Sequence, residues 1–330
     1  MAMMAVRSDL ERGFRDMTKT LIAGIATAAA LLAAPAMAQD KIVLGMSGWT
    51  GFAPLTLAAE AGLFKKHGVD VEIKFIPQKE RHLTVAAGAT QAVATTVDTF
   101  VAWTAAGVPL TQVLLLDKSK GGDGLAVRGN INKITDLKGK TIAVDGAGTT
   151  PYFTLLAFMK RNGMSPKDVQ FATLGPQPAA QAFIAGQYDA ALTYEPYLSS
   201  VRNAPNAGKI LITTLDYPVV VDMVAFQPDY IKKNPKIVQG VVNGYFDALE
   251  MIKKEPAKSN EIMGAKVKQT AEQFATSASY IAWQDKAANQ AYFKGELQTF
   301  MKEAADIQLE AGVIRAIPDL KALVDDTFIK

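Results

Sequence analysis

Short apolar runs alternate with amphipathic segments along the chain from residue 41 onward. The apolar runs have the length and the β-branched content of buried strands, and the segments between them repeat apolar residues at helical spacing. This alternation predicts βα units, in which a mainly parallel sheet carries helices on its faces. The expected strands are 41–46, 69–76, 91–96 and 110–116, followed by 141–144, 169–173 and 190–194.

A glycine-rich segment separates two series of βα units and predicts two lobes. Residues 121–124 read Gly-Gly-Asp-Gly, which is typical of a flexible connection. Beyond residue 208 the pattern changes to two further strand-like runs and then to a mostly helical tail. Two hinge crossings would join the lobes, and the cleft between them is the natural ligand site. We expect an α/β fold with lobe 1 formed by 39–127 and 219–330 and lobe 2 by 128–218.

The first 38 residues have the pattern of a signal peptide. An apolar run at 21–34 follows Lys19 and precedes Ala36-Met37-Ala38, a sequence that suits signal peptidase. We expect cleavage after Ala38 and export to the periplasm. A membrane anchor is the alternative, but about 14 apolar residues are fewer than the roughly 20 that span a bilayer. Acidic residues upstream of Met17 suit a signal peptide poorly, so the start is either Met1 or Met17.

Composition excludes several function classes. The chain has 330 residues, a formal charge of +3 and no cysteine. A small charge without a long Lys or Arg run argues against a nucleic-acid partner. Without cysteine there is no disulfide, no thiolate metal ligand and no lipid-anchored thiol, so we expect a protein free in solution. We also expect a monomer.

Catalytic and metal sites are not apparent in the sequence. The two histidines, His67 and His82, have no partner at metal-ligand spacing. No nucleophile and base stand in a recognisable arrangement. We therefore expect no catalytic residue, no metal and no cofactor.

Several motifs make the chain resemble a known family, the nitrate, aliphatic-sulfonate and taurine group of ABC-importer binding proteins. The resemblance covers nearly all of the chain after the signal peptide, and it extends to thiamine-pyrimidine-precursor binding proteins. It implies a two-lobed periplasmic-binding fold of the second type, which closes on a small molecule and delivers it to an ABC permease in the inner membrane. The motifs are LAAEAGLF at 57–64, GVDVE at 68–72, DLKGKTIAV at 136–144, GQYDA at 186–190, EPY at 195–197 and the ending from 312 to 328.

Ligands of open α/β sheets bind beyond the carboxyl ends of the strands, so the segments after the expected strands supply the candidate ligand residues. Trp49, Thr50 and Phe52 follow the first strand among glycines that allow close backbone approach. Trp49 either forms a flat apolar wall of the cleft or packs in the core. Asp98 follows the third strand, where it faces a cationic group or satisfies the start of the next helix.

Four further candidates belong to the second βα series and to the returning strand. Thr149 and Thr150 precede a helix whose free N–H groups suit an anion or a polar group, unless this segment is only a structural turn. Glu195 ends an apolar strand and faces either the cleft or the dipole of the next helix. Asp222 lies within an apolar run, where an unpaired carboxylate is costly, so it needs a cationic ligand or a buried Lys or Arg. Family members that bind amino-sulfonates often carry an acid at a matching place.

The balance of charge among these candidates points to a class of ligand. Asp98, Glu195 and Asp222 are acidic, whereas Lys79 and Arg81 are the nearest basic residues to any strand end. We therefore expect a small polar ligand with an amino, ammonium or guanidinium group, zwitterions such as taurine included. The alternatives are a sulfonate or nitrate-type anion and a pyrimidine precursor of thiamine. A synthase-like enzyme is the alternative of another class, but such enzymes carry a cysteine-rich segment and histidines that this sequence lacks.

Overall fold

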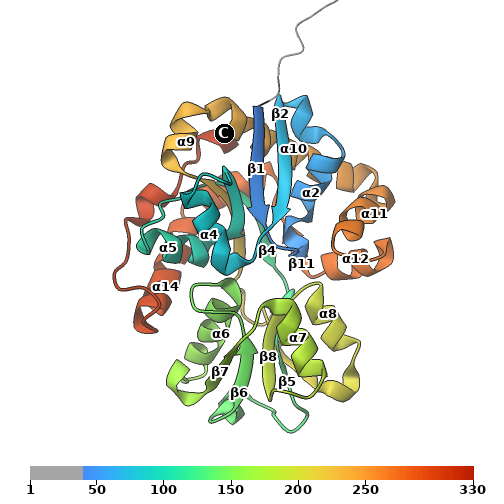
Figure 1. The fold of residues 1–330 in the computed structure, drawn as a ribbon, viewed down its shortest axis with the longest axis vertical. Helices are drawn as coiled ribbons and strands as arrows, with labels where there is room; N and C mark the ends of the chain where they lie inside the picture. The colour runs from blue at the N-terminus through green and yellow to red at the C-terminus, as the bar shows by residue number, and fades with distance from the viewer. Residues whose placement is uncertain (1–39) are drawn as a thin grey trace, which may run out of the picture. The chain divides into compact units, whose positions relative to one another are not determined.

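Two mixed β-sheets organise the chain (Figure 1). The computed structural model describes residues 40–330, so the predicted signal peptide lies outside the described residues. Among the described residues, no helix has both the length and the apolar character needed to cross a membrane. Each sheet has helices of its own, and the chain passes from the first sheet to the second and back.

The first sheet has six strands in the order β11-β4-β10-β3-β1-β2. β1, β2, β3 and β4 run in one direction, while β10 and β11 are antiparallel to their neighbours. All five residues of β3 are buried, which is expected of a central strand with both faces covered. The strands are β1 (Asp40–Met46), β2 (Val69–Phe75), β3 (Ala92–Thr96), β4 (Thr111–Ser119), β10 (Val221–Phe226) and β11 (Ile281–Trp283).

The second sheet has five strands in the order β7-β6-β8-β5-β9. β5 runs antiparallel to both of its neighbours, and the other strands share one direction. The strands are β5 (Asp123–Val127), β6 (Thr141–Val144), β7 (Gln170–Thr173), β8 (Ala190–Tyr194) and β9 (Lys209–Thr213).

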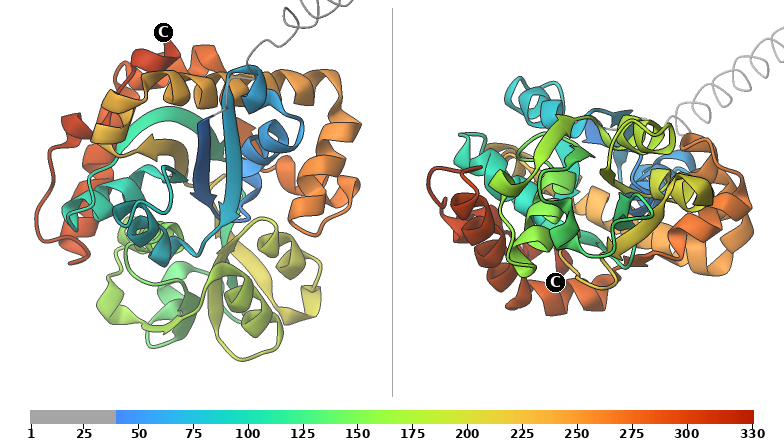
Figure 2. Two further views of the ribbon diagram at one scale, coloured as in Figure 1. Left: turned by 45° about the horizontal axis from the view of Figure 1, so that its top comes forward. Right: turned by 90° about the horizontal axis from the view of Figure 1, so that it is seen from below.

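Helices cover both sheets, and Figure 2 shows that the orange and red helices of the C-terminal part gather around the first sheet. The helices that accompany the first sheet are α2 (Ala53–Glu60), α3 (Leu63–Lys66), α4 (Gln78–Ala86), α5 (Val97–Ala105), α9 (Pro228–Lys233), α10 (Pro235–Lys254), α11 (Pro256–Lys266), α12 (Ala271–Ala278), α13 (Lys286–Phe293) and α14 (Glu296–Glu310). Those of the second sheet are α6 (Thr150–Arg161), α7 (Pro176–Ile184) and α8 (Tyr197–Arg202).

The first sheet has an apolar core on each face, because successive side chains of a strand point to opposite sides. Leu114 and Val224 pack in the cluster beneath α2 and α10, whereas their neighbours Leu115 and Met223 pack in the cluster beneath α5 and α14. This burial holds the sheet rigid, so the segments at its strand ends have a firm support.

The two crossings between the sheets lie side by side. One runs from Ser119 at the end of β4 to Asp123 at the start of β5, and the other from Thr213 to Val221. The hydroxyls of Ser119 and Thr214 are hydrogen-bonded at 2.7 Å and tie the two crossings together. The expected lobe boundary after residue 127 places β5 with lobe 1, whereas β5 hydrogen-bonds to β8 and β9 of the second sheet. An apolar run does not reveal which sheet it joins, and the division into lobes stays a prediction in other respects.

Candidate functional site

A small cavity lies between the two sheets and receives side chains from both. Its volume is about 20 Å³, close to the space that a protein cavity needs to hold one water. A larger molecule therefore fits only if the walls move apart. From the first sheet the lining comprises Ser47, Trp49, Phe52, Gln78, Arg81, Thr95, Thr96, Val220 and Asp222, and from the second sheet Asp123, Thr150 and Tyr194.

Three buried carboxylates form the acidic side of this site. Asp222 on β10 lies opposite Asp117 on β4 in the strand register, and Asp123 begins β5. Asp117 accepts a hydrogen bond from Nε1 of Trp49 at 3.3 Å. The Oδ2 atoms of all three aspartates are buried without a hydrogen-bond partner. Because buried polar atoms are nearly always satisfied, these three oxygens mark a place that is incomplete by itself.

Burial alters the ionisation of these acids. Loss of hydration is the main cause that raises the pKa of Asp117 to about 8 and that of Asp123 to about 7. The pKa of Asp222 is raised well above its ordinary range, first by burial and then by the charges of Asp117 and Asp123. The site thus favours protons, or another source of positive charge.

Arg81 is the one basic side chain among the described residues that line the cavity. It is 1% exposed, and its guanidinium donates to the carbonyl of Ile76 at 3.0 Å and to that of Ala94 at 2.5 Å. Burial lowers its pKa to about 10. The guanidinium is therefore held by backbone carbonyls, and it opposes only part of the negative charge that ionised aspartates would bring.

A network of hydroxyl and amide groups joins the two sheets beside the cavity. Nε2 of Gln78 lies 2.7 Å from the hydroxyls of both Thr95 and Thr150. The hydroxyl of Thr150 is also 2.8 Å from that of Thr96. Thr150 opens α6 of the second sheet, whereas the other residues belong to the first sheet. These hydrogen bonds therefore exist only while the two sheets are close.

The structure brings four of the eight candidate residues together at the cavity, namely Trp49, Phe52, Thr150 and Asp222. Thr50 is buried beside them, and its hydroxyl has no hydrogen-bond partner. The remaining three candidates, Asp98, Thr149 and Glu195, are absent from the lining. A role of any of the eight in ligand binding stays a prediction.

Local structure engages Thr149 and one carboxylate oxygen of Asp98, whereas Oδ1 of Asp98 is buried without a hydrogen-bond partner. Asp98 is buried in the first turn of α5, where Thr99 donates to its carboxylate at 3.3 Å. Burial raises the pKa of Asp98 to about 7. The hydroxyl of Thr149 donates to the carbonyl of Gly146 at 2.7 Å and closes the turn before α6.

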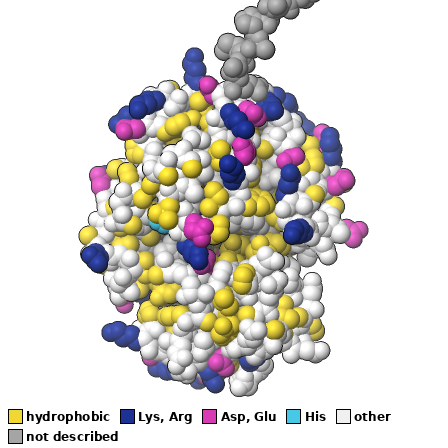
Figure 3. Space-filling model, viewed as in Figure 1, with side chains coloured by type: hydrophobic (Ala, Val, Ile, Leu, Met, Phe, Trp, Pro, Cys, Tyr) yellow, Lys and Arg dark blue, Asp and Glu magenta, His cyan; other side chains and the backbone are white. Residues whose placement is uncertain are grey.

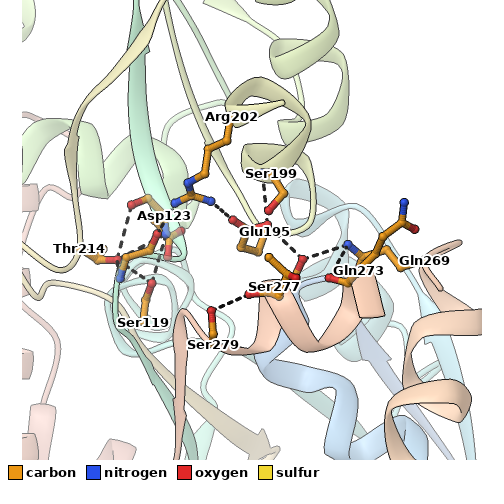
Figure 4. Close-up of polar contacts among 12 residues, drawn as sticks. Ser119, Asp123, Glu195, Ser199, Arg202, Thr214, Gln269, Gln273, Ser277 and Ser279 are labelled. Atoms are coloured by element: carbon orange, nitrogen blue, oxygen red, sulfur yellow. Dashed lines mark hydrogen bonds and ion pairs between the residues drawn. The ribbon is translucent and has the colours of Figure 1, made fainter. Parts of the chain in front are cut away.

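Glu195 lies in a polar cluster near the crossings, shown in Figure 4. Its carboxylate forms an ion pair with Arg202 and accepts hydrogen bonds from the backbone N–H of Ser199 and the hydroxyl of Ser277, both at 3.3 Å. Arg202 also donates to the carbonyl of Gly121 at 2.9 Å. Burial raises the pKa of Glu195, and the charge of Arg202 opposes this shift. Glu195 thus has a cationic partner within the chain and a contact to α12, which accompanies the first sheet.

Sequence reasoning did not select several residues of the cavity. Asp117 directly follows an expected strand, but only the strand register places it opposite Asp222. Asp123 lies in the glycine-rich segment, whose composition indicates a flexible connection and not a ligand site. Gln78 precedes an expected helix, and nothing local indicates that its amide reaches the second sheet. Ser47, Thr95, Thr96, Tyr194 and Val220 also line the cavity.

Charge at the surface differs from charge at the site. On the face shown in Figure 3, Lys and Arg side chains are interspersed with Asp and Glu. The described residues include exposed pairs of opposite charge, such as Lys41 with Glu72 at 3.1 Å. The cavity instead gathers acids that have no such partner. The distinctive charge of this molecule is therefore internal.

Comparisons with known proteins agree with this architecture. The taurine-binding periplasmic protein of Escherichia coli is 30% identical over 145 residues, which are 43% of this chain and 44% of that protein. The match thus spans less than half of that relative. The aliphatic sulphonate binding protein of E. coli superposes with a TM-score of 0.72 at 19% identity, covering 87% of this chain and 92% of the other. The nitrate-binding protein of Synechocystis PCC 6803 gives a TM-score of 0.69 at 18% identity, covering 86% and 85%.

These superpositions confirm the expected α/β periplasmic-binding fold with two sheets flanked by helices. The motif-based resemblance to the nitrate, sulfonate and taurine group is confirmed as well. The NMT1/THI5-like family matches residues 49–259, which include both crossings and all of the cavity lining except Ser47. The chain belongs to the NMT1/THI5-like family.

Proposed function

We propose that this protein is the solute-binding component of an ABC importer and that it captures a small polar solute in the cavity between its two sheets. The observation that carries the proposal is the cavity itself, because it lies at strand ends and takes side chains from both sheets. Relatives whose names denote binding of taurine, sulfonates or nitrate support it. An ABC permease of the inner membrane is then the partner, and the periplasm is the place of action.

The solute carries an amino, ammonium or guanidinium group. Asp222 and Asp123 line the cavity and Asp117 lies behind them, with buried oxygens that have no partner. A simple anion would meet these acids with only Arg81 to oppose them, and that guanidinium already serves two carbonyls. A positive group satisfies the free oxygens and offsets the cost of burying the carboxylates. A zwitterion such as taurine meets this requirement through its ammonium group.

Closure of the two sheets around the solute follows from the same geometry. The cavity holds about one water, so a solute the size of taurine requires the sheets to part before binding. Paired crossings between Ser119 and Asp123 and between Thr213 and Val221 suit a hinge. The hydrogen bonds of Thr150 to Gln78 and Thr96 reform on closure and favour the closed state.

Binding without catalysis agrees with the position of the histidines. His67 contacts Asp247 at 3.1 Å, and the half-buried ring of His82 lies 5.3 Å from that of Trp103, tilted by 30°. Neither histidine lines the cavity, and the chain contains no cysteine. The imidazole bases and thiol nucleophiles of many enzymes are thus not at hand near the solute.

A screen of matched small molecules tests this function. Taurine, ethanesulfonate and ethylamine share one two-carbon skeleton, so they separate the contributions of the ammonium and sulfonate groups. Thermal-shift assays should show that taurine or ethylamine raises the melting temperature and that ethanesulfonate does so far less, because a ligand of the folded state stabilises it. Guanidine, nitrate and pyrimidines complete the screen. Equal stabilisation by ethanesulfonate and taurine would show that the cationic group does not matter.

Localisation and transport need separate measurements. Protein recovered from the periplasm should begin at Gln39 when its N-terminus is sequenced. Deletion of the gene should abolish uptake of the labelled solute into cells. Uptake that persists at the parental rate would contradict the transport role.

A further inference from the structure

Asp117 and Asp222 form an unusual pair at the floor of the cavity. They lie opposite each other on the adjacent strands β4 and β10, and their exposed fractions are 0% and 1%. Each has an Oδ2 atom that is buried without a partner. Asp222 faces the cavity, whereas Asp117 is covered by Trp49, which donates to its Oδ1.

The groups around this pair bring little positive charge. Asp123 comes from β5, Asp98 from α5 and Asp145 from the segment after β6, and all three are buried acids. Tyr194 of β8 and Tyr245 of α10 are neutral phenols at physiological pH, and burial raises the pKa of both. Arg81 of α4 is the cation on this side, and it is bound to the carbonyls of Ile76 and Ala94.

Lys118, the next residue after Asp117, does not neutralise the pair. Its ammonium group lies 3.3 Å from Glu296 and 4.2 Å from the ring centre of Tyr292. Its side chain therefore points away from the cavity, as expected for consecutive residues of a strand.

The two carboxyls lie within side-chain hydrogen-bond reach of each other, and two buried carboxylates so placed cannot both be ionised without a cation, so one proton remains between them. We propose that Asp117 and Asp222 act as one acid pair, which holds a proton while the cavity is empty and exchanges it for the cationic group of the solute. This inference rests on the proposed function. In the exchange the solute arrives as an ammonium or guanidinium ion, the O–H bond of the shared proton breaks, and the proton passes to solvent. The net charge of the site is the same before and after.

In this exchange Asp117 acts differently from the residues that line the cavity. Because it is not part of the lining, Asp117 influences the solute through the proton that it shares with Asp222. A cationic solute competes with that proton, so its affinity rises by up to about tenfold per pH unit where the pair is protonated. Raised pKa values of both carboxyls agree with a pair that is still protonated near neutral pH.

Infrared spectroscopy of the ligand-free protein tests the pair directly. A protonated carboxyl has a carbonyl stretch that is separate from that of a carboxylate. The wild type should keep such a band to pH 7, and the midpoint of its loss should fall by at least about one pH unit in Asp117→Asn, since the remaining acid no longer faces another carboxylate. Asp222→Asn should lower this midpoint in the same way, because Asp117 then no longer faces another carboxylate. Asp98→Asn and Asp123→Asn serve as controls, because burial raises the pKa of each of these acids to about 7 as well; each variant should lose its own part of the band and shift the midpoint of the remaining band far less.

Calorimetry with taurine and ethylamine as probes tests the exchange. At pH 6, titrations in buffers of different ionisation enthalpy should reveal about one proton released per probe bound by the wild type and clearly fewer by Asp117→Asn, in which burial alone still raises the pKa of Asp222. Equal release by both proteins would overturn the proposal, as would a ligand-free wild type without a protonated carboxyl at pH 7. If neither probe binds, the proposed ligand class is wrong, while the infrared result still decides whether the acid pair exists.

Discussion

Two buried acids, Glu195 and Asp222, lie at the ends of strands and have opposite surroundings. Glu195 is bonded to Arg202, to the N–H of Ser199 and to the hydroxyl of Ser277. Asp222 faces another acid, Asp117, and keeps an oxygen without a partner. Both carboxylates are almost fully buried, so burial alone does not distinguish a structural acid from an acid available to a ligand. The difference lies in whether the chain itself supplies the compensating cation.

The two acids differ in the free energy that their burial costs. An ion pair with further hydrogen bonds offsets the loss of hydration, although the net gain over an apolar pair is small. An unpaired buried carboxylate retains the full cost of lost hydration, and this cost lowers the free energy of unfolding. Binding proteins retain such a cost where a ligand relieves it. Under the proposed function, the cavity acids trade stability of the empty protein for selectivity toward a cationic solute.

The largest effect should come from removing the cation beside Glu195. Replacing Arg202 by Met leaves Glu195 buried without its partner and should lower the free energy of unfolding by about 3 kcal/mol. Urea denaturation of the ligand-free protein measures this. The double variant with Glu195→Gln should recover part of the loss, because no charge then remains to be satisfied. A free energy of unfolding that is nearly unchanged in Arg202→Met would mean that Glu195 does not depend on an ion pair with Arg202.

Neutralising Asp222 should act on binding and leave the fold intact. Asp222→Asn preserves the shape but removes a charge-assisted hydrogen bond, so affinity for the cationic solute should fall by about 1.5–3 kcal/mol, or roughly tenfold to a hundredfold. Isothermal titration calorimetry with the best ligand of the screen gives the value. Glu195→Gln is the matched comparison and should change affinity much less. Equal losses of affinity in both variants would show that Glu195 and Asp222 do not differ in their contribution to binding.

The stability of the ligand-free protein should depend on pH in a direction set by the cavity acids. An unfolded Asp titrates near 3.9, whereas burial raises the pKa of Asp117 to about 8 and of Asp123 to about 7 in the folded protein. At a pH between the unfolded and folded pKa values, the folded state therefore binds more protons than the unfolded state. The free energy of unfolding then falls as pH rises from about 4 to about 8. Each such group contributes a slope of at most about 1.4 kcal/mol per pH unit.

Melting temperatures from pH 5 to 8.5 measure this dependence. Asp117→Asn and Asp222→Asn should flatten the curve and raise stability at pH 8. Glu195→Gln should not flatten it to the same degree, because Arg202 opposes the upward shift of the Glu195 pKa. A wild type whose stability increases from pH 5 to 8 would contradict the assignment of the unpaired acids.

A smaller effect is expected at the hydrogen bonds between the sheets. Thr150→Val removes the hydroxyl that meets Gln78 and Thr96 and should destabilise the closed form by about 1 kcal/mol. Thr154→Val in the same helix is the control, since the hydroxyl of Thr154 is buried without a partner. Small-angle scattering should show a larger mean radius for the ligand-free Thr150 variant than for the control. Identical radii would mean that these bonds do not hold the sheets together.

The sequence predicted the fold better than the site, for physical reasons. Alternation of apolar runs and helical stripes is local, so it identified most of the strands, but it did not identify β5, which begins in the glycine-rich segment, or β11, which lies in the mostly helical tail. Contact between Asp117 and Asp222 depends on strand register, which residues more than 100 positions apart do not reveal. The ion pair of Glu195 with Arg202 was easier to predict from the sequence. Arg202 follows Glu195 by seven residues, a spacing that returns to the same side of the intervening helix.

Trp49 connects the acidic floor to the second sheet. Its indole N–H donates to Asp117, and its ring meets the edge of Tyr194 on β8 with centroids 5.5 Å apart. Both contacts would change if the sheets parted or if the charge of Asp117 changed. The emission of an indole depends on the polarity and charge beside it, whereas the other two tryptophans, Trp103 and Trp283, do not line the cavity. The native protein therefore carries a fluorophore at the proposed binding site, and its intrinsic fluorescence can follow occupancy and movement in real time without a label.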